Sequence, residues 1–302
     1  CRRFTRAREV QASGYYPYFV PIEKSYDTEV IIGGERKVMV GSNNYLGLTH
    51  HPKVLEAAAA ALRRYGSGCT GSRFLNGTLD LHEQLEERLA AFMGKEAALV
   101  FSTGYQTNLG VLATLIGRGD YAYLDKLDHA CIVDGARLSY GTIERYGHGD
   151  LAALERMLAE TPEDAGKLIV TDGVFSMEGN IVDLPSLVEL AERYGAEVMV
   201  DDAHSIGVLG EHGGGTAQHF GMVDRVSLIT ATFSKSFASI GGVVAGSEEV
   251  IHYLKHHARS LIFSASMPPA SVATVLAALD VIESEPERRE ALWRNTRRMQ
   301  EG

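Results

Sequence analysis

The chain has 302 residues, of which 45% are hydrophobic and 23% charged, a composition that allows one large folded domain, alone or with a smaller one. Its formal net charge of −10 argues against nucleic-acid binding as the main task, because proteins that bind nucleic acids usually carry a basic face. No apolar run approaches the roughly 20 residues of a membrane span, and three widely spaced cysteines, Cys1, Cys69 and Cys131, favour reduced thiols in the cytoplasm over a disulfide framework or a metal site.

The first forty residues mix aromatic, glycine and charged residues, and we expect them to form an irregular arm. Two amphipathic segments then each end in a glycine, which predicts helices over VLEAAAAALRRYG (54–66) and LHEQLEERLAAFMG (81–94). A third amphipathic segment, LPSLVELAERYG (184–195), also predicts a helix, and helical sequence continues from about Ala270 with an interruption at ESEPERRE.

From residue 97, short apolar runs alternate with helical stretches. Because these runs are apolar throughout, they indicate strands that are buried on both faces. Strands that alternate with helices predict an α/β domain with a mainly parallel central sheet. The predicted strands are AALVF (97–101), YAYL (121–124), KLIV (167–170), EVMV (197–200), VSLIT (226–230) and GGVVA (241–245).

Polar residues follow these strands at the points where they end. In open α/β sheets, ligands bind outside the carboxyl ends of the strands, so we expect these residues to meet at one rim. Hydroxyls, carboxylates, imidazoles and one lysine would then share an active site. The segments are STGY (102–105), DKLDH (125–129), TDGVFS (171–176), DDAH (201–204) and TFSK (232–235).

Lys235 is the residue with the most specific hypothesis. It follows a buried strand, and its neighbours are hydroxyls and small residues that leave room for a bulky ligand. A partly desolvated lysine has a lowered pKa and can form a Schiff base with an aldehyde cofactor. The alternative is an ordinary surface lysine.

Asp201, His204 and His129 are candidates for shaping such a cofactor. Asp201 ends a strand and can pair with a pyridinium nitrogen, or it can cap the next turn, a role that Asp202 can also take. His204 can hydrogen-bond a phenolic oxygen of the cofactor, or it can be a structural histidine in the core. The flat ring of His129 can stack on a cofactor ring.

A phosphate site is indicated at the segment STGY. We expect a helix to begin at about Gly104, and the N–H groups of a helix N-terminus bind anions. Thr232 and the pair Gly241–Gly242 offer further contacts to a phosphate. Each of these features is common by itself, and the prediction of a phosphate site depends on their occurring together.

Eight segments, in order between about residues 15 and 283, together resemble the α-oxoamine synthases, which are fold-type I pyridoxal-phosphate enzymes. The resemblance implies an aspartate-aminotransferase-like large domain with pyridoxal 5'-phosphate as cofactor. It also implies decarboxylative condensation of an amino acid with an acyl-CoA thioester, giving an α-amino ketone, CoA and CO2. The segments are SNNYLGL (42–48), TGSRFLNGT (70–78), FSTGYQTNLG (101–110), LDHACIVDG (127–135), DGVFSMEGN (172–180), VDDAHSIGVLG (200–210), TFSKSFASIGG (232–242) and FSASMPP (263–269).

Within the family, the segment TGSRFLNGT and the SKS around the lysine are most similar to the serine palmitoyltransferase branch, which favours serine as the amino acid and a place in sphingolipid biosynthesis. The activities of 8-amino-7-oxononanoate synthase and glycine C-acetyltransferase stay open. A related pyridoxal-phosphate aminotransferase would use the same lysine and aspartate. A non-catalytic partner subunit would be expected to lack Lys235.

The resemblance implies catalytic roles for four residues. Lys235 forms the Schiff base, and Asp201 pairs with the pyridine nitrogen. His204 contacts the phenolic oxygen. His129 stacks on the ring, aligns the substrate and is a candidate proton donor to the thioester carbonyl.

Further residues are matched to the cofactor and the substrate. Family members build their sites at a dimer interface, so a homodimer is implied, in which one residue reaches the phosphate of the neighbouring subunit. The residues implied at the phosphate are Gly104, Tyr105 and Thr232, with Ser264 from the neighbouring subunit, and those at cofactor- or substrate-side positions are Ser176 and Asn43.

The resemblance also implies a division of the chain. Residues 1–40 are an arm, 41–285 a cofactor-binding large domain, and 286–302 the start of a connection to a small C-terminal domain. Because family members continue for roughly a hundred residues beyond this point, the resemblance implies that the given sequence is a fragment: these residues can bind the cofactor, and full turnover would need the rest.

Overall fold

The computed structural model describes residues 3–302, and the chain divides into two compact units, the first ending at Ser42 and the second running from Asn43 to Gly302. The first unit contains helix α1 (Arg6–Ala12) and an antiparallel sheet of β1 (Lys24–Tyr26), β2 (Glu29–Ile32) and β3 (Glu35–Val38). The expectation of an irregular arm is therefore wrong. The β-branched residues of β2 favour extended structure, and two-residue turns join the three strands.

The second unit is built on a seven-stranded sheet with the order β4-β10-β9-β8-β7-β5-β6. The pairs among β6, β5, β7, β8 and β9 are parallel, and β10 is antiparallel to both β9 and β4, which confirms the mainly parallel sheet. The strands are β4 (Ala97–Phe101), β5 (Tyr121–Asp125), β6 (Thr142–Tyr146), β7 (Lys167–Asp172), β8 (Glu197–Asp201), β9 (Leu228–Thr232) and β10 (Gly242–Gly246).

Two of these strands differ from the prediction. Strand β9 begins two residues later than the apolar run, so that Thr232 is its last residue. Strand β6 was not predicted, because its sequence TIERY carries charges. It lies at the edge of the sheet and only its last residue is buried, so the apolar pattern of a central strand is absent.

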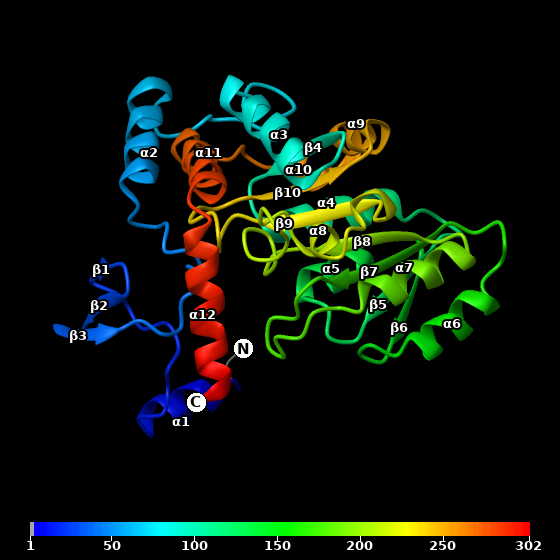
Figure 1. Ribbon diagram of the computed structural model, residues 1–302, viewed down its shortest axis with the longest axis horizontal. Helices are drawn as coiled ribbons and strands as arrows, with labels where there is room; N and C mark the ends of the chain where they lie inside the picture. The colour runs from blue at the N-terminus through cyan, green and yellow to red at the C-terminus, as the bar shows by residue number, and fades with distance from the viewer. Residues whose placement is uncertain (1–2) are drawn as a thin grey trace. The chain divides into compact units, whose positions relative to one another are not determined.

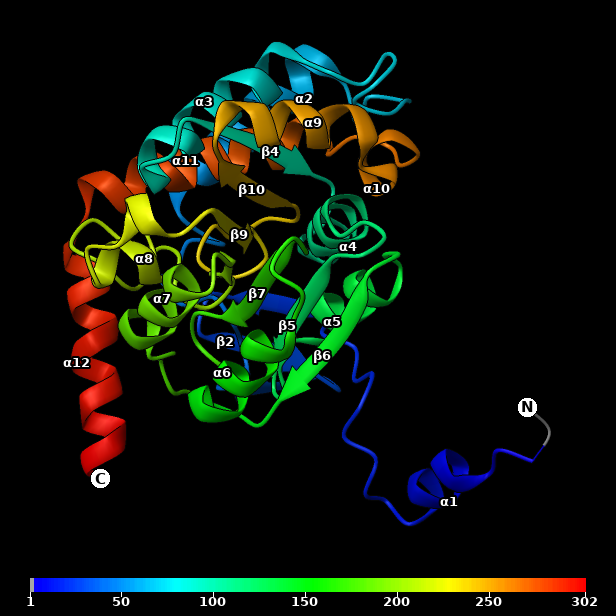
Figure 2. The same cartoon turned by 90° about the vertical axis from the view of Figure 1, so that its right-hand side faces the viewer.

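Helices cover both faces of the sheet (Figures 1 and 2), with α4 and α5 on one face and α6 and α7 on the other. Successive residues of β4 belong to different cores: Ala98 and Val100 lie in the core that includes residues of α3, α6, α7 and α11, whereas Leu99 and Phe101 lie in the core that includes residues of α4, α5 and α9. The helices are α2 (Pro52–Tyr65), α3 (Asp80–Met93), α4 (Gly104–Leu115), α5 (Ala130–Arg137), α6 (Leu151–Glu160), α7 (Leu184–Arg193), α8 (Thr216–His219), α9 (Glu248–His257), α10 (Arg259–Ile262), α11 (Pro269–Ser284) and α12 (Glu287–Glu301), with a 3-10 turn η1 at Val223–Arg225.

The three predicted amphipathic helices are confirmed as α2, α3 and α7, and the interrupted C-terminal helical sequence as α11 and α12.

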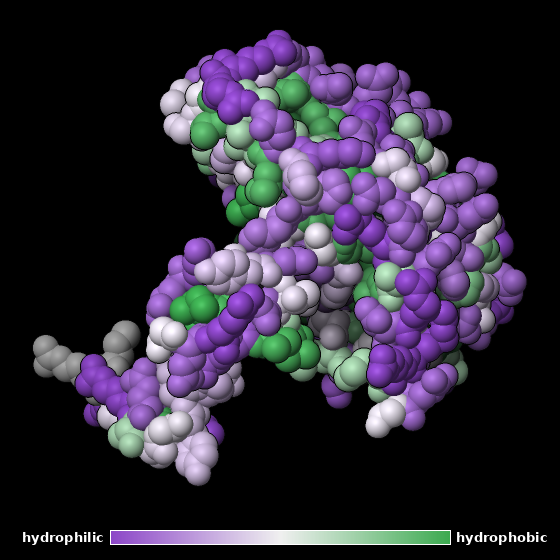
Figure 3. Space-filling model, turned by 60° about the vertical axis from the view of Figure 1, so that its left-hand side comes forward, coloured by the Kyte–Doolittle hydropathy of each residue, from purple (hydrophilic) through white to green (hydrophobic). Residues whose placement is uncertain are grey.

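Hydrophilic side chains cover most of the face drawn in Figure 3, with smaller hydrophobic patches between them. None of the helices within residues 3–302 combines the length and the hydropathy that crossing a bilayer requires.

Candidate active site

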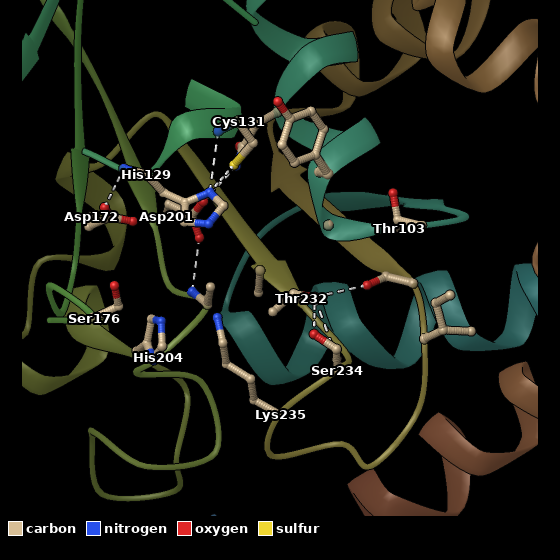
Figure 4. Close-up of a pocket in the computed structure, with 17 residues that line it drawn as sticks. Thr103, His129, Cys131, Asp172, Ser176, Asp201, His204, Thr232, Ser234 and Lys235 are labelled. Carbon is tan, nitrogen blue, oxygen red and sulfur yellow. Dashed lines mark hydrogen bonds between the residues drawn. The ribbon is translucent and has the colours of Figure 1, made fainter. Parts of the chain in front are cut away.

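A cavity of about 410 Å³ lies where the strand ends meet the start of α4. Residues from β7, β8 and β9, and from the segments after β4 and β5, contribute to its wall, so the five polar segments do share one rim (Figure 4). Among the candidate residues, those that line the cavity are Gly104, Tyr105, His129, Ser176, Asp201, His204, Thr232, Lys235 and Gly241.

Lys235 is held by the packing of the turn that carries it. Phe233 and Phe237 on either side are fully buried, and their rings meet edge to face with centroids 5.6 Å apart. The Phe233 N–H donates to the carbonyl oxygen of Gly241 at 3.0 Å, closing the loop. A Cβ at Gly241 would lie 2.7 Å from the Phe233 ring, so this position requires glycine.

The Lys235 side chain points toward Asp201 and His129 (Figure 4). Burial lowers the pKa of its amine, and the negative charges of Asp201 and Asp172 partly oppose that shift. A lysine with a lowered pKa is more often neutral, and a neutral amine is the form that attacks an aldehyde carbon.

The start of α4 forms one end of the cavity. Thr103 caps the helix by accepting a hydrogen bond from the Gln106 N–H at 3.1 Å. A Cβ at Gly104 would lie 2.7 Å from Thr232, so the glycine lets the helix N-terminus approach the end of β9. The N–H groups of this first turn and the hydroxyls of Thr232 and Ser234, which lie 3.0 Å apart, suit an anion such as phosphate.

Asp201 is 4% exposed and accepts two hydrogen bonds from N–H groups. The Asn108 amide donates to Oδ2 at 2.6 Å, and the backbone N–H of Ala203 donates to Oδ1 at 2.9 Å. Both oxygens of Asp201 therefore act as acceptors, an arrangement that suits pairing with a protonated ring nitrogen.

His204 is positioned by Tyr45, whose hydroxyl lies 2.7 Å from Nδ1. Burial, with smaller effects of Lys235 and His129, lowers the pKa of His204 to about 4, so the ring is neutral at pH 7. When the Tyr45 hydroxyl donates to Nδ1, the proton of the neutral ring is on Nε2.

His129 is fixed at both its backbone and its ring. Its N–H donates to Asp172 Oδ2 at 2.9 Å, and its Nδ1 lies 2.9 Å from the Cys131 sulfur. Asp202, the alternative turn cap, is fully buried and accepts from the Thr216 N–H at 3.0 Å, and so has a structural role.

Three candidate residues do not line the cavity. Ser264 accepts a hydrogen bond from the Gln106 side chain at 3.0 Å, beside the start of α4. Asn43 is exposed, and its Oδ1 lies 3.3 Å from the Tyr45 hydroxyl oxygen. Gly242 is buried as the first residue of β10.

Three further residues of the predicted polar segments line the cavity, although the sequence assigned them no individual role: Thr103, Asp172 and Ser234. Asp172 had the same signal as Asp201, a carboxylate at the end of a buried strand. No site role was predicted from the sequence for Tyr45, Asn108 and Cys131. Asn108 lies one helical turn after Gly104 and so faces the same way, whereas no sequence pattern indicated the contact of Tyr45.

The cavity fits pyridoxal phosphate. Its wall offers an amine for the aldehyde, a buried carboxylate for the ring nitrogen, and a helix N-terminus beside hydroxyls for the phosphate. The close approach of Gly104 to Thr232 leaves the phosphate end concave, since any larger side chain there would clash with β9. Lys235, Asp201, Gly104 and Thr232 are the residues that would hold the cofactor.

Comparisons with known proteins show which family the chain resembles. The family model described as aminotransferase class I and II matches residues 35–302. The chain is 58% identical to a serine palmitoyltransferase of Sphingobacterium spiritivorum, over 97% of this chain and 73% of the relative, and 45% identical to an 8-amino-7-oxononanoate synthase of Geotalea daltonii, over 97% and 75%. A solved serine palmitoyltransferase variant from S. paucimobilis, with a bound PLP–myriocin aldimine, superposes with a TM-score of 0.94 at 37% identity, covering 96% of this chain and 74% of that one.

Proposed function

The chain belongs to the aminotransferase class I and II family and, within it, to the α-oxoamine synthases, and from that premise we propose that it condenses L-serine with an acyl-CoA thioester. The products would be an α-amino ketone, CoA and CO2. The observation that carries the proposal is a half-buried lysine, Lys235, facing a buried carboxylate, Asp201, across a cavity of suitable size.

The cofactor accounts for one part of the chemistry: bound pyridoxal phosphate supplies an electron-withdrawing ring that stabilises negative charge on the α-carbon of an amino acid. Lys235 is the residue that would hold the aldehyde carbon through Nζ. Burial lowers the pKa of its amine, so the same group would serve as the base for the α-proton of the substrate. Asp201 would pair with the ring nitrogen, its two oxygens already held by the N–H groups of Asn108 and Ala203.

The two histidines act on oxygen atoms in this proposal. His204 is neutral at pH 7 and donates its Nε2 proton to the phenolic oxygen. His129 stacks on the ring and donates a proton to the thioester carbonyl as negative charge develops there. Gly104, Tyr105 and Thr232 bind the phosphate.

The remaining assignments are also proposals. Ser264 would act across a homodimer interface, which is consistent with its position beside the cavity and outside its wall. Ser176 and Asn43 would contact cofactor or substrate. We also propose a cytoplasmic location, and an arm (1–40), a cofactor-binding large domain (41–285) and a C-terminal segment (286–302) as the functional parts.

A spectral titration followed by product analysis tests the proposal. The protein is reconstituted with pyridoxal phosphate and titrated with L-serine, glycine or L-alanine, and an acyl-CoA is then added. L-serine should change the cofactor spectrum at the lowest concentration, and mass spectrometry should find the matching amino ketone with free CoA. Preference for L-alanine would favour the 8-amino-7-oxononanoate synthase activity. A keto acid formed without release of CoA would contradict the proposal and indicate an aminotransferase.

A further inference from the structure

Two carboxylates, not one, end neighbouring strands at the floor of the cavity. Asp172 is the last residue of β7 and Asp201 the last of β8, and the two are register partners in the parallel pair. They are 5% and 4% exposed, and both line the cavity. Two buried carboxylates so close together do not both ionise readily, because like charges repel strongly where water is scarce.

The surroundings of the two carboxylates differ. Asp201 accepts one N–H group on each oxygen, from Asn108 and Ala203. Asp172 accepts the His129 N–H on one oxygen, and the charged groups acting on it are Asp201, Asp125 and Lys235. Burial and then the charge of Asp201 raise the pKa of Asp172 well above its ordinary value, against smaller opposing effects of the His129 N–H and Lys235. A proton shared by the pair therefore belongs on Asp172.

Asn108 is the donor that distinguishes Asp201 from Asp172, and its orientation is fixed. It is 2% exposed on α4, and its Oδ1 accepts a hydrogen bond at 3.0 Å from the hydroxyl of Thr230, which is also buried. The amide nitrogen consequently faces Asp201 at 2.6 Å and the Cys131 sulfur at 3.0 Å. The reverse orientation would set the amide oxygen against a carboxylate, two acceptors with no proton between them.

From this arrangement we infer that Asn108 is a positioning residue: its amide, oriented by Thr230, keeps Asp201 the ionised member of the Asp172–Asp201 pair and directs its charge at the cofactor ring nitrogen. The inference rests on the proposed function, because it needs pyridoxal phosphate at Lys235. Asn108 acts through Asp201 and does not take part in the chemistry itself.

A cofactor analogue separates this role from simple packing. In the deaza analogue of pyridoxal phosphate, a ring CH replaces the ring nitrogen, so the interaction with Asp201 is removed while shape, aldehyde and phosphate remain. Apoprotein is titrated with either compound, and binding is followed by fluorescence. The variants are Asn108→Leu, of similar size without the amide, and Thr230→Val, which removes only the hydroxyl that orients it. Thr274→Val on α11 is the matched control, because its half-buried hydroxyl bonds the Ala270 carbonyl one turn earlier in the helix, away from the cavity.

We expect Asn108→Leu to weaken binding of pyridoxal phosphate by about tenfold, the effect of losing one hydrogen bond to a charged group, and to change binding of the deaza analogue by less than about threefold. Thr230→Val should shift binding in the same direction by a smaller factor, and Thr274→Val should alter binding of neither compound. Should Asn108→Leu fail to fold, Thr230→Val carries the test alone.

Equal weakening for both compounds in Asn108→Leu and Thr230→Val would overturn the inference and leave only a packing role. Unchanged binding of pyridoxal phosphate in both variants would overturn it as well. If the wild-type protein bound both compounds equally, Asp201 would not act on the ring nitrogen, and the inference would also fall. Failure of the wild-type protein to bind either compound would be a failure of the proposed function, recognisable because no variant is needed to observe it.

Discussion

Two regions of the second unit bury charge in opposite ways. Near β4, the Arg73 guanidinium forms a two-pronged ion pair with Glu86, with distances of 2.7 and 3.0 Å, and it also donates to the Val100 carbonyl. The Val100 N–H donates to Glu86 at 2.9 Å, so each charge in this region is satisfied by protein groups. In the cavity, Asp172 and Asp201 are buried and Lys235 is half-buried around open space, and burial shifts the pKa values of Lys235 and Asp172 away from their ordinary values.

The two regions illustrate two roles of buried charge: charges that pair with each other support the fold, and charges that face a cavity serve function. A buried ion pair with complete hydrogen bonding is destabilised by the loss of either partner, because the remaining charge is left uncompensated. Charges around a cavity oppose folding until a ligand binds, and groups with shifted pKa values in a cleft are typical of active sites. Changes in the cavity should therefore abolish function and spare the fold, and changes near Arg73 should do the reverse.

The largest effect is expected for Lys235→Ala. Losing the amine removes both the cofactor attachment and the base, so condensation should fall by at least about 10³-fold. Urea unfolding of the apoprotein should show unchanged or increased stability, because a buried amine without a full ion pair is gone. Lys126→Ala, at an exposed lysine after β5, is the control. Activity within tenfold of the wild type would refute the role of Lys235.

Asp201→Asn is expected to have the next largest effect. The amide can still occupy the site, so part of the cofactor should remain bound, but the ring nitrogen loses its ionic partner and product formation should fall by about 10²-fold. Asp150→Asn changes the charge equally at the start of α6, away from the cavity. Comparable rates for Asp201→Asn and the wild type in the condensation assay would contradict the assignment.

Arg73→Leu tests the other region. We expect the free energy of unfolding in urea to drop by about 3–5 kcal/mol, because Glu86 would be left buried without its partner. Cofactor binding by the folded fraction should persist. Breaking the exposed pair of Arg225 and Glu192 with Arg225→Ala should change stability little, since water screens that pair. Equal losses of stability in Arg73→Leu and Arg225→Ala would show that burial of the Arg73–Glu86 pair adds nothing to the stability of the fold.

His82, near Arg73, should give the smallest effect, and one that depends on pH. The ring is fully buried, accepts from the Leu79 N–H at 3.0 Å and lies 3.0 Å from the Met267 carbonyl oxygen; burial, then the charge of Arg73, lowers its pKa from 6.5 to about 4. Below pH 6.5 the unfolded chain binds a proton that the folded chain does not, so the stability that neutral His82 contributes is present above pH 6.5 and is lost as pH falls toward 4.

The wild type should therefore be more stable than His82→Gln at pH 7, and this advantage should shrink by roughly 2 kcal/mol between pH 7 and pH 5. Urea unfolding of both proteins at the two pH values measures it. A difference in stability that stays constant with pH would mean that the ring is charged, or equally accessible to protons, in the folded protein.

The sequence was sufficient to predict the features that depend on local pattern. Apolar runs identified six strands of the sheet. The polar residues after these runs identified most of the cavity wall, including Lys235 and Asp201, because the strand ends meet at one edge of the sheet and this does not depend on the details of side-chain packing. Strand β6 was missed because one charged edge strand does not show the pattern of a central strand.

What could not be predicted depends on contacts between distant segments. Asn108 contacts Asp201, which lies 93 residues away in the sequence, and Tyr45 contacts His204, which lies 159 residues away. No local sequence pattern predicts either contact. In the sequence, Arg73 appeared only as one residue of the family segment TGSRFLNGT. The structure shows that it has a structural role, because it pairs with Glu86 of α3. Ser264 requires a second subunit for its proposed role, which one sequence does not describe.

Borohydride reduction of the reconstituted protein, followed by peptide mapping, tests the central claim most directly. Reduction fixes an imine permanently, so the amine that holds the cofactor carries its mass. We predict a single modified peptide, with the label on Lys235. A label on any other lysine, or no label after incubation with pyridoxal phosphate, would contradict the account.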